Sequence, residues 1–318
     1  MKALVTGGTG FIGRGVVDLL LEGNHTVRLF SRRTSVPQRW VKGDIEVFQG
    51  DLEDFPSVAS AMEGVDVFYH VGEIKNISRA ASQRNISLVE EITDGLAEKG
   101  IRRFVFVSSI TTAGIPSSIP ADEETKPSVI LRDHYTYGKR ECERYITDNS
   151  GAAEYVVIRP APVYGPGSRY LGRIVNTIRT LGPVGLPFPG AAKNLAPLIY
   201  VKDLAKAIYL SGLREGAANQ IFNITDGIRH SWLDFLEAVA KLSGKKVRII
   251  SLPHFLFKFP SFFLDIFSEI FGFELDMQHY VDFFSKDIFF DNAKAKKMLA
   301  WEPDYCELTE GVKEMLAG

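Results

Sequence analysis

The chain of 318 residues is long enough for one large α/β domain or two modest domains, and therefore for a sizeable core. Its 37 Lys and Arg residues nearly balance its 39 Asp and Glu residues, the net charge is −2 and no basic run occurs, which argues against a nucleic-acid-coating role. The hydrophobic share of 45% and the charged share of 24% argue against disorder and against a polytopic membrane protein.

The first half of the chain alternates short apolar runs with longer amphipathic stretches, a pattern typical of parallel strands covered by helices on both faces. The predicted fold class is therefore α/β, a doubly wound parallel sheet followed by a smaller, mainly helical C-terminal lobe. We predict strands over residues 2–6, 26–30, 46–49, 65–69, 104–108, 155–159 and 220–224. After Pro160, Pro and Gly become frequent and the alternation stops, which indicates the start of the second lobe.

The N-terminus combines a strand, a glycine-rich turn and a helix start, in the sequence Lys2-Ala3-Leu4-Val5-Thr6-Gly7-Gly8-Thr9-Gly10-Phe11-Ile12-Gly13. Glycines let the backbone approach a pyrophosphate, whose charge is met by the N-terminus of the following helix. The spacing fits both Gly8-x-Gly10-x-x-Gly13 and Gly7-x-x-Gly10-x-x-Gly13. The motif predicts a dinucleotide-binding turn of the Rossmann type, and a tight turn without a ligand is the alternative.

The end of the second predicted strand indicates which dinucleotide binds. Where an acidic residue would accept hydrogen bonds from the adenosine ribose, the sequence reads Phe30-Ser31-Arg32-Arg33-Thr34. A guanidinium binds a 2′-phosphate, whereas a carboxylate would repel it. We therefore expect NADP rather than NAD, with Arg32 as a ligand, and the alternative is that both arginines are solvated loop residues.

Two further segments carry the groups for acid–base chemistry. The strand over residues 104–108 brings Ser108 and Ser109 to the carboxyl edge of the sheet, where ligands of open α/β sheets bind. Tyr135 and Lys139 lie four residues apart, on one face of a helix, so the ammonium can lower the pKa of the phenol toward working pH. With a nicotinamide cofactor, this combination predicts hydride transfer between an alcohol and a ketone.

Together these motifs resemble the extended short-chain dehydrogenase/reductase superfamily of NAD-dependent epimerase/dehydratase type, and 3β-hydroxysteroid dehydrogenases and dihydroflavonol reductases in particular. The resemblance includes the segments Gly50-Asp51-Leu52, Arg159 to Gly167, Tyr200 to Ala205, Phe222 to Gly227 and Leu299 to Pro303. It implies that Tyr135 is the acid/base, that Lys139 lowers its pKa and holds the nicotinamide ribose, and that Ser109, rather than Ser108, binds the reacting oxygen. It implies these cofactor contacts: Gly7, Thr9, Gly10, Phe11, Ile12, Gly13, Arg32, Asp51, Leu52, Val71, Tyr135, Lys139, Pro160 and Val163.

Several positions depart from the family pattern or remain open. Thr111-Thr112-Ala113-Gly114 replaces the usual Val-Tyr-Gly after the serine. Val71-Gly72-Glu73 replaces a small apolar pair, and we expect the Glu73 side chain to face solvent rather than the site. His134 is likewise expected at the surface, Asn85 is expected to start a helix, and we assign no metal ligand.

The substrate is expected to be apolar. Sugar-nucleotide members carry an arginine at the place of Ala196, whereas Lys193-Asn194-Leu195 resembles the steroid dehydrogenases. We therefore predict an oxidoreductase for a secondary alcohol or ketone of the hydroxysteroid or dihydroflavonol type. The alternatives are a sugar-nucleotide epimerase, dehydratase or reductase that uses Arg169, Arg173 or Arg179, and a non-catalytic NADP sensor or scaffold.

The Phe-rich segment 254–273 holds much of an unusual excess of Phe, 22 residues against 11 Tyr. Its aromatic residues recur at helical spacing, and its charges and Pro260 exclude a membrane span. Packing in the core, a lid over an apolar ligand, and an interfacial helix on a bilayer all remain open.

The organisation that follows is a cofactor domain over residues 1–165, with returning segments at about 198–226, and a substrate lobe over residues 166–197 and 227–318. Cys142 and Cys306 cannot form a framework of bridges, and the chain opens directly into a strand, so we expect a cytoplasmic protein in a reducing compartment. The resemblance implies a homodimer, formed through the helices after Asn85 and Tyr135.

Overall fold

The computed structural model describes residues 1–74, 78–181, 184–253, 255–256 and 282–317, without the side chains of residues 169–170, 173 and 179–181. Most of the Phe-rich segment 254–273 lies outside these residues. Phe255 and Leu256, the two members that are described, expose 60% and 46% of their surface.

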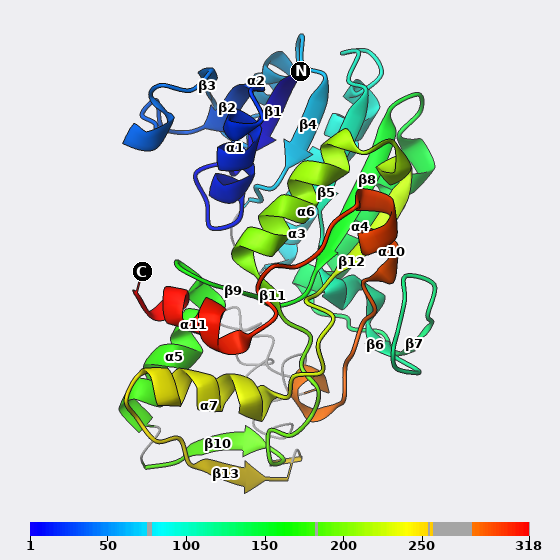
Figure 1. Ribbon diagram of the computed structural model, residues 1–318. Coiled ribbons are helices and arrows are strands. Elements are labelled where there is room, and N and C mark those ends of the chain that lie inside the picture. Colours follow the sequence, from blue (N-terminus) through cyan, green and yellow to red (C-terminus); the bar gives the residue numbers. More distant parts are fainter. Residues whose placement is uncertain (75–77, 182–183, 254, 257–281, 318) are drawn as a thin grey trace.

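A parallel sheet of seven strands forms the centre of the molecule, in the order β12-β8-β5-β4-β1-β2-β3 (Figure 1). The strands are β1 (Lys2–Thr6), β2 (Thr26–Ser31), β3 (Ile45–Gln49), β4 (Val67–His70), β5 (Arg103–Val107), β8 (Glu154–Pro160) and β12 (Gln220–Ile224). The order reverses between β1 and β4, which is the topological switch point of a Rossmann fold. The predicted fold class is thus confirmed, and every predicted strand is present with bounds that differ by at most two residues.

Helices cover both faces of the sheet. One face is covered by α1 (Gly13–Glu22), α6 (Val201–Leu213) and α10 (Ala293–Leu299), and the other by α2 (Phe55–Ala61), α3 (Arg79–Gly95) and α4 (His134–Asn149). The apolar stripe of α1, with Val16, Val17 and Leu20 fully buried, packs on the first face. This helix ends where Gly23 and Asn24 follow it, and Asn24 adopts a positive φ of 55°.

The helices α3 and α4 pack against each other and begin at polar capping residues. The Ser78 side chain accepts a hydrogen bond from the amide of Ala81, and that of Asp133 accepts one from the amide of Thr136. Because α3 starts at Arg79, Asn85 lies well inside the helix, and the expectation that Asn85 starts it is wrong.

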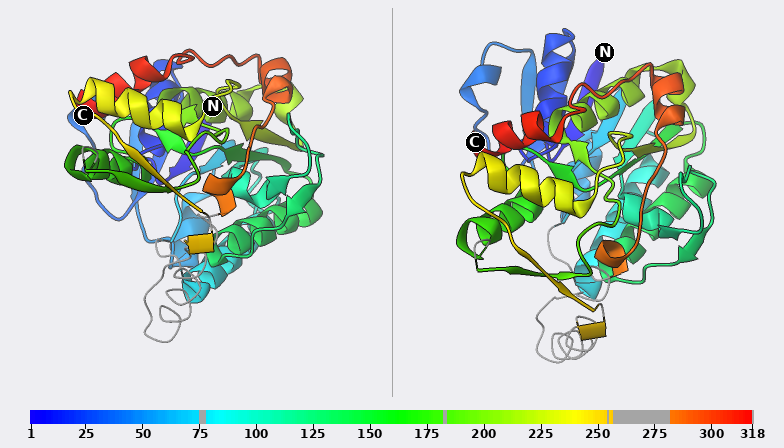
Figure 2. Two further views of the ribbon diagram at one scale, coloured as in Figure 1. Left: turned by 90° about the horizontal axis from the view of Figure 1, so that it is seen from below. Right: turned by 60° about the horizontal axis from the view of Figure 1, so that its bottom comes forward.

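A third set of elements lies beyond the carboxyl ends of the sheet strands, where it forms its own apolar cluster (Figures 1 and 2). In it α7 (Trp232–Leu242) packs against both α5 (Arg169–Leu181) and α11 (Leu308–Ala317). Short paired strands complete it: β10 (Leu186–Pro189) with β13 (Ile249–Leu252), and β9 (Val163–Tyr164) with β11 (Ile199–Tyr200). A hairpin of β6 (Ile115–Pro116) and β7 (Pro127–Val129) and three short 3₁₀ turns, Gln38–Trp40, Ile110–Ala113 and Glu215–Ala217, fill the remaining connections.

The C-terminal segment is tied back to the start of α6. The Asp203 carboxylate accepts hydrogen bonds from the amides of Asp304 and Tyr305, at 2.9 and 3.0 Å, and the Trp301 indole donates to the Asp203 carbonyl. Within the part of the chain that is described, no helix is both long and apolar enough to cross a bilayer.

Candidate active site

The glycine-rich turn after β1 is built on close backbone contacts. Gly7 has a φ of +67°, and a Cβ on it would lie 2.6 Å from the Cα of Gly72. A Cβ on Gly13 would lie 2.3 Å from the carbonyl oxygen of Gly7, which also accepts a hydrogen bond from the amide of Gly10. The turn therefore uses the spacing Gly7-x-x-Gly10-x-x-Gly13. Gly8 instead leaves room for the side chains of the core beneath it.

The N-terminus of α1 opens onto this turn. Ile12 precedes the helix and no side chain caps it, so an anion could take the place of a capping oxygen. The loop after β4 is held against the turn, because the amide of Gly72 donates to the Thr6 hydroxyl at 3.2 Å. The turn from Gly7 to Gly13 thus forms a hollow that the Cβ atom of a larger residue would fill, and it lies beside the uncapped N-terminus of α1. This arrangement fits the pyrophosphate of a dinucleotide.

The predicted adenosine contacts lie on neighbouring loops. Arg32 follows β2 and is exposed, and Asp51 and Leu52 follow β3. The two loops meet because Ser31 pairs with Gln49 and the amide of Gly50 donates to the carbonyl of Ser31. The structure thus brings Arg32 and Asp51 to one corner of the sheet.

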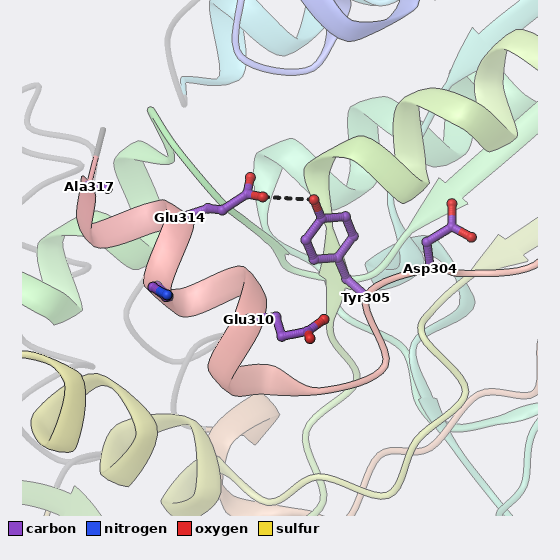
Figure 3. A pocket seen from close by; sticks show the side chains of 6 residues that line it. Asp304, Tyr305, Glu310, Glu314 and Ala317 are labelled. Atoms are coloured by element: carbon purple, nitrogen blue, oxygen red, sulfur yellow. Dashed lines mark hydrogen bonds between the residues drawn. The ribbon is translucent and has the colours of Figure 1, made fainter.

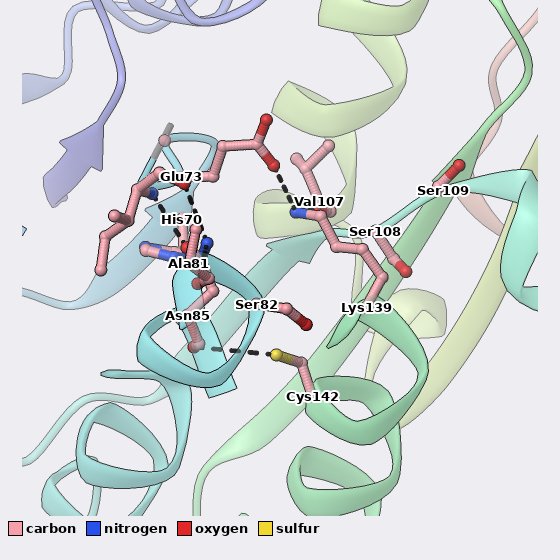
Figure 4. Close-up of polar contacts among 12 residues, drawn as sticks. His70, Glu73, Ala81, Ser82, Asn85, Val107, Ser108, Ser109, Lys139 and Cys142 are labelled. Carbon is pink, nitrogen blue, oxygen red and sulfur yellow. Dashed lines mark hydrogen bonds and ion pairs between the residues drawn. The ribbon is translucent and has the colours of Figure 1, made fainter. Parts of the chain in front are cut away.

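Tyr135, Lys139 and Ser109 come together at the carboxyl edge of the sheet. Figure 4 shows the Lys139 side chain reaching from α4 toward Glu73 at this edge. The Lys139 ammonium donates to the carbonyl of Val107 at 3.0 Å and lies 5.9 Å from the centre of the Tyr135 ring. The Ser109 hydroxyl lies near enough to Tyr135 to lower the pKa of the phenol through hydrogen bonding. A phenol, an ammonium and a hydroxyl are therefore close enough to act on one carbonyl or alcohol oxygen.

The two adjacent serines have different surroundings. The Ser109 oxygen accepts hydrogen bonds from the amide and the hydroxyl of Thr111, at 3.3 and 2.9 Å, so its own proton is available to Tyr135 or to a substrate. Thr111 in turn accepts from the Thr136 hydroxyl at 3.0 Å. Ser108 is turned away and donates to the buried Glu143.

Glu143 organises a buried network behind the serines that the sequence did not reveal. It forms an ion pair with Arg159 at 2.5 Å and accepts from the Thr112 hydroxyl at 2.8 Å. The Thr112 hydroxyl also lies 2.7 Å from the Ser109 carbonyl, which anchors the 3₁₀ turn Ile110–Ala113 after the serines. Glu143 lies four residues after Lys139, one helical turn further along α4, and that spacing was the available signal.

Glu73 is exposed to solvent, as expected, but its carboxylate also reaches the site, which was not expected. Its carboxylate lies 3.3 Å from the Lys139 ammonium, although 44% of its side chain remains exposed (Figure 4). The backbone of the loop that carries it is fixed by Asn85, whose amide side chain bonds to both the N–H and the carbonyl of Ile74 at 2.9 Å.

The pKa of Tyr135 also differs from the expectation. Burial and then the Glu73 carboxylate raise the pKa of Tyr135 to about 12, and they outweigh the lowering by Lys139 and by the hydrogen bond with Ser109. Burial would lower the pKa of Lys139, but Glu73 and Tyr135 outweigh it and keep the ammonium charged. In this arrangement the phenol is protonated at neutral pH.

The remaining predicted residues line the same edge. Pro160, at the end of β8, pairs with Ile224, and Val163 pairs with Ile199, while Val71 is half-buried against the core. His134 is exposed at the start of α4, in agreement with the surface position expected for it.

The substrate-side positions are only partly described. Ala196 is buried, and Lys193 is exposed. The side chains of Arg169, Arg173 and Arg179 lie outside the described part of the structure.

A surface hollow of about 570 Å³ lies elsewhere, along α11 (Figure 3). It is lined by Asp304, Tyr305, Glu310, Lys313, Glu314 and Ala317, and none of the predicted site residues is among them. In it the Tyr305 hydroxyl donates to Glu314 at 2.8 Å, and Lys202 pairs with the same carboxylate at 2.8 Å. These contacts fasten α11 to the start of α6, so we interpret the hollow as a by-product of this attachment rather than as the active site.

The sheet order, the glycine turn and the Tyr–Lys pair define an enzyme of the extended short-chain dehydrogenase/reductase class, whose members are NAD-dependent oxidoreductases and epimerases. The chain belongs to the NAD dependent epimerase/dehydratase family, whose model matches residues 3–225.

Two characterised relatives and one solved structure illustrate the similarity. A 3 beta-hydroxysteroid dehydrogenase/Delta 5-->4-isomerase of Mycobacterium tuberculosis is 28% identical over 337 residues, covering 95% of this chain and 86% of the relative. A UDP-glucose 4-epimerase of Vibrio cholerae is 25% identical over 324 residues, covering 98% and 93%. A short-chain dehydrogenase/reductase superfamily protein from Agrobacterium tumefaciens with bound NAD has the same fold, with a TM-score of 0.75 at 20% identity, covering 100% of this chain and 96% of that one.

Proposed function

We propose that this protein is an NADP-dependent oxidoreductase that transfers a hydride between the nicotinamide and an apolar secondary alcohol or ketone of the hydroxysteroid or dihydroflavonol type. The observation that carries the proposal is the convergence of Tyr135, Lys139 and Ser109 at the sheet edge that also holds the Gly7–Gly13 turn. The fold alone would not distinguish this chemistry from others.

In this proposal each residue has one role. When bound, the nicotinamide supplies or accepts the hydride. Tyr135 exchanges a proton with the substrate oxygen, Ser109 hydrogen-bonds the same oxygen, and Lys139 stabilises the phenolate and holds the nicotinamide ribose. The turn from Gly7 to Gly13, with Thr9, Phe11 and Ile12, would hold the pyrophosphate, and Asp51, Leu52, Val71, Pro160 and Val163 would line the rest of the cofactor.

Replacement of Tyr135 by Phe tests the catalytic assignment. The variant should lose turnover and keep its affinity for the cofactor, since the phenol oxygen acts on the substrate. Tyr137→Phe is the matched control, because Tyr137 lies on the same helix with 48% of its surface exposed. Unchanged turnover in Tyr135→Phe would refute the assignment of Tyr135 as the acid/base, whereas a wild-type protein that binds NADP and turns over neither substrate class would favour a non-catalytic sensor or scaffold.

The preference for NADP rests on Arg32, which is exposed at the end of β2. A guanidinium there can pair with the 2′-phosphate. Arg32→Ala should weaken NADP binding roughly 10- to 150-fold and leave NAD binding nearly unchanged, since one charge-assisted phosphate contact is worth roughly 1.5–3 kcal/mol. A wild-type protein that binds NAD tenfold more tightly than NADP would refute the preference.

The apolar substrate class is supported by the buried Ala196, which leaves no cation at that position for a substrate diphosphate. The similarity to the mycobacterial steroid dehydrogenase points the same way. A sugar-nucleotide substrate is the second candidate, favoured by the similarity to the Vibrio epimerase over nearly the whole chain. Thermal-shift measurements with cofactor present distinguish them: stabilisation by UDP-sugars, and none by steroids or flavonoids, would reverse the order.

We further propose a cytoplasmic homodimer that pairs through α3 and α4. Its cofactor domain would comprise residues 1–165 with the segments at about 198–226, and residues 166–197 and 227–318 would form the substrate lobe. Sedimentation analysis tests the assembly: a monomer at micromolar concentration would contradict it.

A further inference from the structure

Glu73 lies where its charge acts on both Lys139 and Tyr135. It follows β4 at the carboxyl edge of the sheet, in a loop that Asn85 holds by both backbone groups of Ile74. Its partner Lys139 comes from α4, 66 residues later in the chain. The 3.3 Å ion pair therefore joins the loop of the cofactor-binding edge to the catalytic helix (Figure 4).

The Lys139 ammonium donates hydrogen bonds to two acceptors. The Val107 carbonyl accepts one hydrogen bond at 3.0 Å and the Glu73 carboxylate another. The lysine side chain is 13% exposed, so its charge is poorly solvated and the nearby carboxylate acts on it strongly. As a result, less of the ammonium charge is available to stabilise a Tyr135 phenolate.

Among the titratable groups near Tyr135 and Lys139, Glu73 is the main negative charge that opposes the Lys139 ammonium. Burial lowers the pKa of His70 to about 3 and raises that of the Cys142 thiol to about 12, so both are neutral near pH 7. Asp133, at the start of α4, acts on Tyr135 in the same direction as Glu73 but more weakly.

We propose that Glu73 is a positioning residue that sets the upper pH limit of carbonyl reduction: by pairing with the Lys139 ammonium, it keeps the Tyr135 hydroxyl protonated, as a proton donor, to higher pH. The inference rests on the proposed function and adds to it the pH range over which Tyr135 can donate its proton. A small apolar residue, which the family usually carries in this loop, could form no such pair.

Carbonyl reduction requires one hydride and one proton. When bound, the reduced nicotinamide would supply the hydride to the carbonyl carbon of the ketone, and Tyr135 would give its proton to the carbonyl oxygen as the C=O bond becomes a C–O single bond. Two electrons pass with the hydride, so the ketone is reduced to the alcohol and the cofactor is oxidised. The Tyr135 phenolate then takes a proton from water.

Titration of Tyr135 in the cofactor-free protein tests the inference without reference to turnover. Tyrosine labelled with ¹³C at Cζ reports ionisation by NMR, and Tyr135→Phe assigns the signal. With a pKa of about 12, only about 3% of Tyr135 is ionised at pH 10.5. If Glu73→Gln lowers that pKa by about one unit, about a quarter should be ionised, since a charged neighbour at this range shifts a pKa by roughly 1–3 units.

Two further variants make the comparison specific. Glu73→Asp keeps the charge on a shorter side chain, so its titration should fall between those of the wild type and Glu73→Gln. Glu53→Gln removes an exposed carboxylate paired with Arg84 at 3.5 Å, away from Tyr135, and should titrate like the wild type. Circular dichroism at each pH confirms that the variants are folded. A Tyr135 titration that is the same in Glu73→Gln and in the wild type would overturn the proposal.

A kinetic measurement distinguishes failure of this inference from failure of the proposed function. If the protein reduces ketones, the fall in kcat at high pH should begin about one pH unit lower in Glu73→Gln than in Glu53→Gln, with KM within about twofold. An unshifted limb in an active enzyme would contradict the role of Glu73. Retained turnover in Tyr135→Phe would instead contradict the catalytic assignment, whatever Glu73 does.

Discussion

Substitution of Gly13 by Ala tests the geometry of the cofactor turn. The added Cβ would lie 2.3 Å from the carbonyl oxygen of Gly7, 2.8 Å from its carbonyl carbon and 2.9 Å from the Cα of Gly8. Carbon contacts are comfortable at about 3.5–4.0 Å, so the backbone of the turn must move by roughly 1 Å. That backbone cannot yield without cost, because the Gly7 carbonyl also accepts the hydrogen bond from Gly10 at 2.8 Å.

Gly13→Ala should lower the free energy of unfolding by about 1–3 kcal/mol, the usual cost of adding a methyl group where the surrounding atoms cannot move freely. Gly172→Ala is the matched control: it adds the same methyl group inside α5, where the structure places no atom within 4 Å of the new Cβ. The control should stabilise the protein by roughly 0.5–1 kcal/mol, because alanine favours helices over glycine. The two identical chemical changes should thus move stability in opposite directions.

Urea unfolding measures the stability of both variants, and fluorescence titration measures their affinity for NADP. Gly13→Ala should lose stability and bind NADP at least tenfold more weakly, since the displaced turn is the surface that the pyrophosphate contacts. Gly172→Ala should keep the affinity of the wild type. If Gly13→Ala unfolded at the same urea concentration and bound NADP normally, our description of the turn would be refuted.

Substitutions at three other positions test the surroundings of the site and the attachment of α11. Glu143→Gln should cost about 3 kcal/mol in urea unfolding, because its buried arginine partner is left uncompensated, and a loss below about 1 kcal/mol would contradict a structural role. Thr111→Val should lower kcat about tenfold by releasing Ser109, and Thr111→Ser should restore it; equal activity of the two would argue against hydrogen-bond control of Ser109. Hydrogen bonds, first from Lys202, lower the pKa of Glu314 to about 2 from its usual 4.5, so its stabilisation is complete above about pH 4.5 and is lost as the pH falls toward 2. Glu314→Gln should therefore melt below the wild type at pH 7 and approach it at pH 2, and a constant gap would contradict this linkage.

The features that the sequence predicted correctly are local in the chain. The strands, the glycine turn, and the helix that carries Tyr135 and Lys139 each depend on patterns within about ten neighbouring residues. The predicted fourth strand ended at Tyr69, one residue early, because His70 does not extend an apolar run. In the structure His70 is buried, and its ring lies beside that of Phe106.

The features that could not be predicted depend on partners far apart in the chain. Glu73 reads as a solvent-facing residue until the fold places Lys139 beside it. The pKa of Tyr135 was expected to fall because its helical neighbour is positive, whereas burial and an acid from another loop decide its direction. Burial and electrostatics at the site depend on residues that come together only when the sheet is assembled. No single short stretch of the sequence therefore predicts them.

The bonds between Asp203 and the amides of Asp304 and Tyr305 have a consequence for biosynthesis. The partners are 101 and 102 residues apart, and Trp301 buries its ring in the core that α6 shares with the sheet. A ribosome releases the sheet strands long before it releases these partners, so the nascent chain holds one face of its sheet incompletely covered until residues 301–305 have also emerged. We expect pulse proteolysis of stalled nascent chains to show full protection only after Tyr305 has left the exit tunnel, and protection of chains stalled near residue 260 would disprove this order of events.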